Sequence, residues 1–589
     1  MSATPEASLD FCNTNSLWCS VLVESLVQLG LRQVVISPGS RSAPLTFAFA
    51  RHARIEAIPV LDERSAGFYA LGLAKQRHRP VALVCTSGTA AANFLPAIVE
   101  AHESGVPLLV LTADRPPELR DCHSGQTIDQ QKLYGGYVNF HHELAVPEAS
   151  LSLLRYLRQT LSHAYCMTVR PVSGAVHLNC PFRDPLPPVT QTLTADMAGA
   201  AFEGFFAGME DSSPTGGMLQ LPLGGPLWPK LTGEREGVIV VGPCDPAGAP
   251  QRFAQNIGSV SRALGWPVLA DALSPVRNYA AESGHVVAHY DAILRSELRA
   301  QALRPKQVIC VGGWPTSKVL RTWLQKWDPE TVIITEGANN HDALHLRTGS
   351  IRSGLGGWSV GFNGKRQLTL YAKLWLEAER RVRRSLAAAL AQEKGLVEPA
   401  CVPLLAKHLP RDTVLFVANS MPVRDLEYFW PAGGGGRRIK FNRGANGIDG
   451  TLSTALGVAH GQERPAVLLT GDLALLHDTN GFLTVPKFKG SLTIVLINNN
   501  GGGIFEHLPV AKFEPPFEEF FATPQNIDFK KLCATYGVGH TLVTDWKHFA
   551  KLVAKLPPRG VRVLEVRTDR KRDAAFRQAL FAKLAATKI

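Results

Sequence analysis

Residues 455–472, ALGVAHGQERPAVLLTGD, repeat the pattern of residues 70–87, ALGLAKQRHRPVALVCTS. The shift is constant, since 455 − 70 and 464 − 79 both equal 385. At the same shift, the apolar run 108–114 (LLVLTAD) falls on 493–499 (TIVLINN). Apolar runs of this kind, bounded by Pro and polar residues, are typical of buried strands in a parallel sheet. Two copies of one α/β unit are the simplest explanation.

The two copies differ at the positions where chemistry would take place. The second copy has Asp472 and Asn499 where the first has a serine and an aspartate, and the first has Glu63 where the second has Ile448. One copy has therefore gained oxygen ligands of the kind that bind metals, and the other a carboxylate. We expect the two halves to serve different ends of one ligand.

The length and composition indicate a globular protein of several domains. At 589 residues the chain far exceeds the roughly 100 to 200 residues of a usual domain. Its hydrophobic content of 45% and charged content of 19% are ordinary for a folded protein. We predict three doubly wound α/β domains with parallel sheets, of which the first and third are homologous. Their expected limits are residues 1–190, 191–380 and 381–589.

Short β-branched runs alternate with helical patterns along most of the chain, which is typical of parallel sheets covered on both faces. The expected strands include residues 34–36, 81–84, 108–111, 174–178, 237–242, 308–312, 331–334, 414–417, 466–469 and 493–497. A charged helical stretch is expected at 374–393. The Gly- and Pro-rich residues 198–237 are expected to form a linker and irregular surface.

The net charge of +12 does not indicate a nucleic-acid-binding protein, because the Lys and Arg residues are scattered rather than gathered into a stripe with interleaved aromatic residues. Polyanionic substrates explain the charge better. The first basic residue is Arg32, and no apolar run approaches the roughly 18 residues that a spanning helix needs. We therefore expect a cytoplasmic protein that binds neither nucleic acid nor membranes. Its ten cysteines form no CxxC pair and are expected to be reduced and buried.

Asp472 and Asn499 each follow a predicted strand, 27 residues apart, with Gly501 close behind the second. In an open α/β sheet, ligands bind beyond the carboxyl ends of the strands, so both side chains would face one crevice. A carboxylate, an amide oxygen and a backbone carbonyl are hard oxygen ligands that Mg2+ accepts, with a diphosphate completing the octahedron. These three residues are therefore predicted to bind a metal-diphosphate group. The alternative is a strand-end Asp and an Asn-Gly turn without a ligand.

Four further segments accompany this pattern: 36–42 (ISPGSRS), 111–119 (LTADRPPEL), 442–450 (NRGANGIDG) and 498–505 (NNNGGGIF). The Gly-Asp pair followed at that distance by Asn-Asn resembles the metal-diphosphate motif of thiamine-diphosphate-dependent enzymes, which usually have Gly where this chain has Leu473. The four segments are similar to one branch of that family, the synthases that join 2-oxoglutarate to isochorismate. The similarity covers the first and third domains almost throughout and is looser in the middle domain.

The resemblance implies an enzyme of the transferase class with thiamine diphosphate and Mg2+ or Mn2+ as cofactors. Its reaction would be decarboxylation of 2-oxoglutarate and 1,4-addition of the resulting succinyl carbanion to isochorismate, in menaquinone or phylloquinone biosynthesis. The first domain would bind the pyrimidine of the cofactor, and the third its diphosphate and metal. The alternatives are another thiamine-diphosphate carboligase or 2-oxo acid decarboxylase and, from a different class, a non-catalytic nucleotide-binding or regulatory protein that kept the fold.

Glu63 matches the family glutamate that hydrogen-bonds the aminopyrimidine ring of the cofactor and thereby favours deprotonation of the thiazolium carbon. A carboxyl at a strand end beside Val60 and Leu61 would be desolvated and able to share a proton. The alternative is a surface Glu that opens the following helix. Ile448 matches the bulky residue on which the cofactor bends, with core packing as the alternative. Because Glu63 and Ile448 lie on different copies, and the family pairs such domains between chains, the resemblance implies a homodimer or homotetramer.

The remaining site residues are carried over from the matched motifs. Residues expected to contact the cofactor, besides Ile448 and the three metal ligands, are Pro38, Thr86, Ser420, Val423, Gly471, Leu473 and Ile504. Residues expected to bind the dicarboxylate substrates are Ser40, Arg41, Arg115, Gln126, Lys318, Arg424, Arg443, Phe505 and Leu508. Arginine suits this task because its planar donors match a carboxylate. Each assignment has an alternative. The cations could be solvated surface charges, Ser420 could be a helix N-cap, and the apolar residues could belong to the ordinary hydrophobic core.

The middle domain carries the weakest signals. Lys318 lies at the family's middle-domain lysine, where the pattern often continues with Arg but this chain has Val319. Residues 242–245 (GPCD) contain no G-x-G-x-x-G motif, so we expect neither flavin nor NAD there. Glu506 and His507 lie near the matched motifs and are assigned no role.

Overall fold

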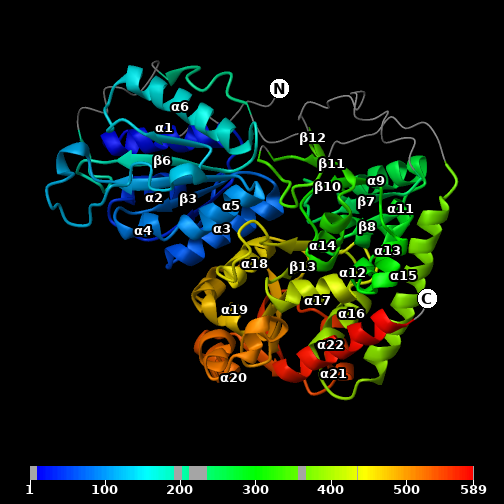
Figure 1. Cartoon of the computed structure of the whole chain (residues 1–589). Helices are drawn as coiled ribbons and strands as arrows, with labels where there is room; N and C mark the ends of the chain where they lie inside the picture. The colour runs from blue at the N-terminus through cyan, green and yellow to red at the C-terminus, as the bar shows by residue number, and fades with distance from the viewer. Residues whose placement is uncertain are drawn as a thin grey trace. The chain divides into compact units, whose positions relative to one another are not determined.

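The computed structural model describes residues 9–191, 202–210, 235–337, 339–355, 366–433 and 435–587. In these residues the strands form three six-stranded sheets, and the strand pairings are parallel (Figure 1). The chain divides into two compact units. The first comprises residues 1–215, 442–461 and 478–489, and the second comprises residues 216–441, 462–477 and 490–589. The α/β fold with three parallel sheets is the one that the sequence predicts.

The first sheet lies in the first unit and has the strand order β2-β1-β3-β4-β6-β5. Its strands are β1 (Gln33–Ile36), β2 (Glu56–Pro59), β3 (Val81–Cys85), β4 (Leu108–Asp114), β5 (Phe140–Glu143) and β6 (Ala175–Pro181). The four strands β1, β3, β4 and β6 are buried throughout, as expected of parallel strands with helices on both faces.

Two groups of helices cover the first sheet. Side chains of α1 (Thr14–Gln28), α2 (Ala43–Arg51) and α6 (Leu151–Val169) share a hydrophobic core with the sheet. Helices α3 (Glu63–Arg77) and α5 (Leu95–Ser104) pack on each other; in Figure 1 they lie below β6, and α1 and α6 lie above it. Polar caps fix where these helices begin: Asp62, for example, accepts a hydrogen bond from the Arg64 N–H at the start of α3 (2.9 Å).

The internal repeat produces a symmetric helix contact within the first unit. Helix α18 (Thr451–Ala459) packs against α3, its equivalent in the first copy. A Cβ atom on Gly72 would lie 2.1 Å from the Thr454 carbonyl oxygen, and one on Gly457 would lie 2.1 Å from the Tyr69 carbonyl oxygen. The 385-residue shift converts the first pair into the second. The same glycine in each copy therefore allows the two helix backbones to approach closely.

The second sheet lies in the second unit and has the strand order β12-β11-β10-β7-β8-β9. Its strands are β7 (Gly237–Val241), β8 (Val268–Ala270), β9 (Val286–Val287), β10 (Gln307–Val311), β11 (Glu330–Thr335) and β12 (Thr348–Arg352). Its helices include α9 (Pro250–Leu264), α12 (Tyr290–Leu294), α14 (Lys318–Trp327) and α15 (Leu370–Gln392). The chain begins in the middle of this sheet and extends to each side in turn, as in doubly wound nucleotide-binding folds.

The third sheet, also in the second unit, has the strand order β14-β13-β15-β16-β18-β17. Its strands are β13 (Val414–Val417), β14 (Arg438–Phe441), β15 (Ala466–Gly471), β16 (Ser491–Asn498), β17 (Gly539–Leu542) and β18 (Gly560–Arg567). Its helices include α16 (Glu398–His408), α17 (Met421–Phe429), α19 (Asp472–His477), α21 (Trp546–Ala554) and α22 (Arg570–Ala586). The strand order repeats that of the first sheet, which confirms that the first and third α/β units are copies.

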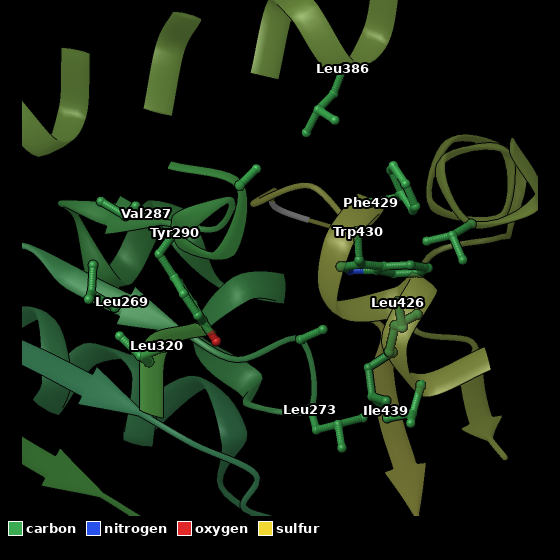
Figure 2. Close-up of a cluster of buried hydrophobic side chains, with 14 of the residues drawn as sticks. Leu269, Leu273, Val287, Tyr290, Leu320, Leu386, Leu426, Phe429, Trp430 and Ile439 are labelled. Atoms are coloured by element: carbon green, nitrogen blue, oxygen red, sulfur yellow. The ribbon is translucent and has the colours of Figure 1, made fainter. Parts of the chain in front are cut away.

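One hydrophobic core joins the second and third sheets. It includes Leu320 of α14, Leu386 of α15 and Phe429 of α17, together with Trp430 directly after α17. Figure 2 shows part of this cluster. Helix α17 carries two of the expected site residues, Val423 and Arg424, so this shared core fixes the position of both.

Each strand expected from the sequence is present, and the helix expected at 374–393 corresponds to α15. The sequence pattern does not reveal β5 and β17 at the sheet edges, because their residues are only partly buried and form no apolar run. The expected linker at 198–237 lies outside the described residues except at 202–210 and 235–237.

The cysteines are all free. The expectation that they are buried is wrong for Cys122, which is exposed, and is only partly met by Cys12 and Cys166. Among the helices of the described residues, none has both the length and the apolar character needed to cross a bilayer.

Candidate active site

Two arginines of the first unit lie close together beyond the carboxyl ends of its strands. Arg41 follows β1 and is 9% exposed, and Arg115 follows β4 directly. The Arg41 Nη1 donates to the Phe182 carbonyl oxygen (2.9 Å), while its Nε has no hydrogen-bond partner in the described residues. Burial lowers the pKa of Arg41, and the charge of Arg115 lowers it further. A carboxylate bound here would relieve this repulsion between neighbouring cations.

Arg115 and Gln126 are positioned by the same residue. The Arg115 Nη1 donates to Ser87 Oγ (3.1 Å), and the Gln126 Nε2 donates to the Ser87 carbonyl oxygen (2.9 Å). Gly88 permits this packing, because it has φ +87° and a Cβ atom there would lie 2.9 Å from Gln126 Cγ. The structure therefore brings Arg41, Arg115 and Gln126 to one edge of the first sheet.

Pro38, Ser40 and Thr86 lie at the same edge. Pro38 and Ser40 are exposed in the loop after β1, and Thr86 is buried directly after β3. Strands β1 and β3 are neighbours, and Thr86 fills the space beside Gly39, where a Cβ atom would lie 2.2 Å from the Thr86 Cβ. Gly39 thus allows the two loops to meet.

Glu63 is the first residue of α3 and is half-buried. The neighbouring Asp62 accepts hydrogen bonds from Arg64 Nη2 and Asn480 Nδ2, both at 2.7 Å. Glu63 itself makes no side-chain hydrogen bond within the part of the chain that the structure describes. Burial raises the pKa of the Cys85 thiol, and the Glu63 charge raises it further. Glu63 therefore opens a helix, as the alternative interpretation expects, but it is half-buried rather than at the surface, and its carboxylate makes no side-chain hydrogen bond in the described residues.

Arg443 and Ile448 lie in the loop that precedes α18. Glu100 of α5 anchors this loop, because its carboxylate accepts hydrogen bonds from the Gly444 N–H (3.1 Å) and the Ala445 N–H (2.7 Å). Ile448 is half-buried. It is therefore not a fully buried core residue, as the core-packing alternative would expect.

In the second unit, Asp472, Asn499 and Gly501 lie beyond the ends of the neighbouring strands β15 and β16. Asp472 is 5% exposed; its Oδ1 accepts from the Leu473 N–H and its Oδ2 from the Gly501 N–H, both at 2.8 Å. Burial raises the pKa of Asp472 to about 6. Asn499 is also buried, and its Oδ1 has no hydrogen-bond partner in the described residues. The structure thus brings the three expected metal ligands together.

These residues fit a hard divalent cation. A desolvated carboxylate and an unpartnered amide oxygen are both unfavourable until a cation compensates them, and both are donors of the kind that Mg2+ and Mn2+ bind. Gly471 leaves open space beside Asp472, since a Cβ atom there would meet nothing within 4 Å. The described residues contain no cluster of three or more His, Cys, Asp or Glu side chains suited to a metal. The expected ligand set is of a different kind, because Asp472 is its one carboxylate and the other two ligands are the Asn499 amide oxygen and the Gly501 carbonyl.

Glycine is required at position 501 for two reasons. Gly501 has φ +141°, and a Cβ atom there would lie 2.4 Å from the Ala522 carbonyl oxygen. The Gly502 N–H donates to that same oxygen (2.7 Å). The loop after β16 is therefore fixed against residue 522, which holds Gly501 over Asp472.

Ser420, Val423 and Arg424 lie at the start of α17. Ser420 has φ +68° and its hydroxyl does not cap the helix, so the helix-cap alternative for this side chain is wrong. Such backbone strain often occurs at functional sites. The Arg424 Nη1 donates to the Ser420 carbonyl oxygen (2.7 Å), and burial lowers the pKa of Arg424. Val423 is fully buried in the shared core.

Ile504, Phe505 and Leu508 follow Gly501 in the loop after β16, the first two within the 3-10 helix η5 (Gly503–His507). Ile504 and Phe505 are half-buried and Leu508 is 45% exposed, so these apolar side chains line a surface rather than the sealed core. The neighbouring His507 has its pKa lowered to about 4 by burial and by nearby arginines.

Lys318 is the exposed first residue of α14. Ser317 caps this helix, accepting from the Leu320 N–H (3.0 Å) and donating to an Asp291 carboxylate oxygen (2.6 Å). Val319 packs against the shared core, which gives a structural reason for an apolar residue at the position where the family often has Arg.

Sequence reasoning missed several residues that position the site. Asn179 Nδ2 donates to Asp114 (2.8 Å), next to Arg115, and Gln130 Nε2 donates to Asn179 Oδ1 (3.0 Å). A polar Asn that is buried with the rest of strand β6 is a signal that could have revealed this network. Arg570 holds the loop after β16 by donating to Glu506 (3.0 Å) and to the Asn500 carbonyl oxygen (3.1 Å), and no sequence pattern indicates it.

The expected residues thus form two sets. Those of the first unit are Pro38, Ser40, Arg41, Glu63, Thr86, Arg115, Gln126, Arg443 and Ile448. Those of the second unit are Lys318, Ser420, Val423, Arg424, Gly471, Asp472, Leu473, Asn499, Gly501, Ile504, Phe505 and Leu508.

Three family descriptions match successive parts of the chain. Residues 19–133 match "Thiamine pyrophosphate enzyme, N-terminal TPP binding domain", residues 225–417 match "Middle domain of thiamine pyrophosphate" and residues 427–566 match "Thiamine pyrophosphate enzyme, C-terminal TPP binding domain". The fold is similar to a solved benzoylformate decarboxylase from Polynucleobacter necessarius, at 15% sequence identity and a TM-score of 0.66, covering 94% of this chain and 98% of that one.

Curated relatives with much higher identity bear the name 2-succinyl-5-enolpyruvyl-6-hydroxy-3-cyclohexene-1-carboxylate synthase. One from Nostoc sp. (strain PCC 7120 / SAG 25.82 / UTEX 2576) is 52% identical over 586 residues, covering 98% of this chain and 99% of the relative. One from Trichodesmium erythraeum (strain IMS101) is 49% identical over 580 residues, covering 97% and 98%. The chain therefore belongs to the thiamine-diphosphate-dependent enzymes and, among them, to the 2-succinyl-5-enolpyruvyl-6-hydroxy-3-cyclohexene-1-carboxylate synthase family.

Proposed function

We propose that this chain decarboxylates 2-oxoglutarate and joins the remaining succinyl unit to isochorismate by 1,4-addition. The product is 2-succinyl-5-enolpyruvyl-6-hydroxy-3-cyclohexene-1-carboxylate, in menaquinone or phylloquinone biosynthesis, and the enzyme is a transferase. The observation that carries the proposal is 52% identity, over 98% of the chain, with a synthase of that name. The arginines at the edge of the first sheet support dicarboxylate substrates over a simple 2-oxo monoacid.

Asp472, Asn499 and the Gly501 carbonyl would hold Mg2+ or Mn2+ and, through it, the diphosphate end of the cofactor. The Gly501 carbonyl accepts one hydrogen bond, from the Gly503 N–H (2.9 Å), and retains a second lone pair for the metal. When bound, thiamine diphosphate supplies the electron sink for loss of CO2 and for carbon–carbon bond formation. The other residues assigned to cofactor binding are Pro38, Thr86, Ser420, Val423, Ile448, Gly471, Leu473 and Ile504.

Glu63 is assigned the catalytic role of exchanging a proton with the pyrimidine ring of the cofactor. Two features support this assignment. Its carboxylate is half-buried and unengaged, whereas the adjacent Asp62 is occupied by Arg64 and Asn480. Its position in the first turn of α3 also stabilises a negative charge through the helix dipole.

The cationic and polar residues would bind and orient the substrates. Arg41 and Arg115 would pair with carboxylates, supported by Ser40 and Gln126, and Arg424, Arg443 and Lys318 would supply further positive charge. Phe505 and Leu508 would exclude water from the reacting carbons. Positioning two dicarboxylates in this way contributes to the rate by making the addition effectively unimolecular.

We also propose that the enzyme is cytoplasmic and acts as a homodimer or homotetramer. Glu63 and Ile448 occupy the same position of two different copies of the repeat. Both residues lie in the first unit of this chain, so the proposal rests on the family resemblance, in which the first-type and third-type domains around one cofactor come from different chains.

Turnover by a variant pair tests the catalytic assignment. Glu63→Gln keeps the size of the side chain but cannot take up a proton, and we expect it to lower kcat by about 10²- to 10⁴-fold while thiamine diphosphate still binds. Asp62→Asn is the matched control, because Asn caps helices as well as Asp does, and it should retain kcat within a few fold. A Glu63→Gln enzyme with kcat near that of the wild type would remove Glu63 from the mechanism.

A further inference from the structure

The first unit contains a cavity of about 680 Å³ that lies away from the proposed active site. Its wall includes Gln33, Glu56 and Val81, the first residues of β1, β2 and β3. The proposed cofactor contacts Pro38 and Thr86 follow the opposite ends of β1 and β3. The cavity is therefore at the amino edge of the sheet, about 13 Å from the carboxyl edge, the length of a four-residue strand.

Five cations line this cavity: Arg32, Arg54, Arg77, Arg79 and Lys489, with Glu56 as the one carboxylate in its wall. Glu56 neutralises Lys489, whose Nζ donates to it (2.9 Å). Arg54 is paired with Glu24 at 2.5 Å. Arg32 and Arg77 have no carboxylate partner in the described residues; they donate instead to backbone carbonyl oxygens. At least two guanidinium charges therefore remain uncompensated.

A hydrogen-bond network engages Glu56 with partners other than those two arginines. The His460 Nδ1 accepts from the Tyr69 hydroxyl (2.6 Å) and the Lys489 N–H (3.3 Å). The proton of this imidazole is thus on Nε2, which donates to Glu56 (3.1 Å). These donors hold the pKa of Glu56 well below its usual range, the His460 hydrogen bond contributing most. The carboxylate stays charged, and three donors, Gln33, His460 and Lys489, already engage it.

The second sheet provides an internal comparison. A cavity of about 400 Å³ lies at its amino edge, where the Gln307–Glu330 pair (2.9 Å) repeats the Gln33–Glu56 pair (2.9 Å) of the first sheet. Two of its three cations are paired with carboxylates, Lys306 with Glu236 and Arg347 with Asp328, each at 3.2 Å. The local architecture is the same, but among the described residues the cavity of the first unit has two guanidinium groups without a carboxylate partner, whereas that of the second sheet has one, Arg304, which lies over the Trp327 ring.

We infer that the cavity of the first unit is a binding site for a small polyanion that carries phosphate or carboxylate groups, separate from the active site. Planar guanidinium groups bind both kinds of oxyanion through paired hydrogen bonds. The cavity volume is in the range of small-molecule sites, and a local hollow lined by several cations suits a compact ligand better than a nucleic-acid strand, which needs an extended groove.

Isothermal titration of the full-length enzyme, saturated with thiamine diphosphate and Mg2+ and held at constant ionic strength, tests this inference. Inorganic phosphate and succinate are the two titrants, and whichever binds more tightly identifies the preferred group. We expect Arg77→Gln to weaken binding of the better titrant by about tenfold, the effect of losing one charge-assisted hydrogen bond. Arg304→Gln, in the cavity of the second sheet, should leave binding unchanged.

Arg77 is the preferred position because it is exposed and its one recorded contact, with the Gly461 carbonyl oxygen, is long at 3.4 Å, so its loss should leave the fold intact. An unchanged thermal unfolding curve would verify this. Arg32→Gln is the second variant and should weaken binding similarly. The inference is overturned if neither anion binds the wild type at millimolar concentration, or if Arg77→Gln and Arg304→Gln bind both anions as the wild type does.

Discussion

Arg277 uses every donor of its guanidinium group inside the second unit, and its replacement by methionine should be strongly destabilising. Its Nε donates to the Ala270 carbonyl oxygen (2.7 Å) and its Nη1 to the carbonyl oxygens of Glu427 (2.9 Å) and Trp430 (3.0 Å). Its Nη2 donates to the Ala288 carbonyl oxygen (2.6 Å) and to Glu427 Oε2 (3.0 Å). The side chain is 0% exposed and that of Glu427 1%, so water cannot replace these bonds.

Arg277→Met removes one partner of a buried ion pair, which costs about 3–5 kcal/mol in the free energy of unfolding. Burial already raises the pKa of Glu427 well above its usual range, and Arg277 is the charge that opposes this rise. The double variant Arg277→Met/Glu427→Leu should regain only part of the loss: it leaves no unpaired charge, but the buried carbonyl oxygens to which Arg277 donates and the Ala272 N–H still lose their partners. Arg464→Ala breaks an ion pair with Asp412 whose side chains are 62% and 48% exposed and should cost less than about 1 kcal/mol.

Urea unfolding of the three variants and hydrogen exchange of the peptide that contains α17 provide the measurement. We expect exchange of α17 to accelerate in Arg277→Met and to stay at the wild-type rate in Arg464→Ala. A loss below about 1 kcal/mol for Arg277→Met, or equal losses for the two single variants, would show that this buried pair does not hold α17 as we argue.

Three further predictions concern the cofactor site and the repeat. Asp472→Ala should abolish Mg2+-dependent binding of thiamine diphosphate, and calorimetry showing undiminished affinity would refute the ligand assignment. Gly457→Ala should lower the unfolding temperature, because its Cβ would lie 2.1 Å from the Tyr69 carbonyl oxygen, whereas Gly136→Ala, with nothing within 4 Å, should not; equal temperatures would contradict the close helix contact. Burial raises the pKa of Asp478 to about 6, so the stability this carboxyl contributes below about pH 4 is lost as the pH rises through 6. Asp478→Asn should therefore unfold at a higher temperature than the wild type at pH 8 but not at pH 4, and a constant difference between the two pH values would exclude this cause.

The repeat explains why so much of the fold could be predicted from the sequence. Buried strands such as β15 and β16 are continuous apolar runs, and their polar ends, Asp472 and Asn499, fall where a parallel sheet binds ligands. Edge strands such as β5 could not be predicted in the same way, because an edge strand is only partly covered and its residues need not be apolar.

The positioning residues could not be predicted because their partners are distant in the sequence. Arg277 and Glu427 are 150 residues apart, and Arg570 reaches Asn500 across 70 residues. Each is an ordinary charged residue within its own segment, and only the packing of separate elements gives it a role. The backbone conformation of Ser420, with φ +68°, is likewise a consequence of the folded loop rather than of its local sequence.

Isochorismate consumption by the purified enzyme tests the central claim most directly. The assay contains 2-oxoglutarate, thiamine diphosphate and Mg2+, and each component is omitted in turn. We expect isochorismate to disappear only when all three are present, with 2-succinyl-5-enolpyruvyl-6-hydroxy-3-cyclohexene-1-carboxylate as the product. If 2-oxoglutarate is decarboxylated while isochorismate persists, the cofactor site stands but the acceptor is wrong. If neither substrate is consumed under any condition, the assignment of this chain as an active synthase is contradicted.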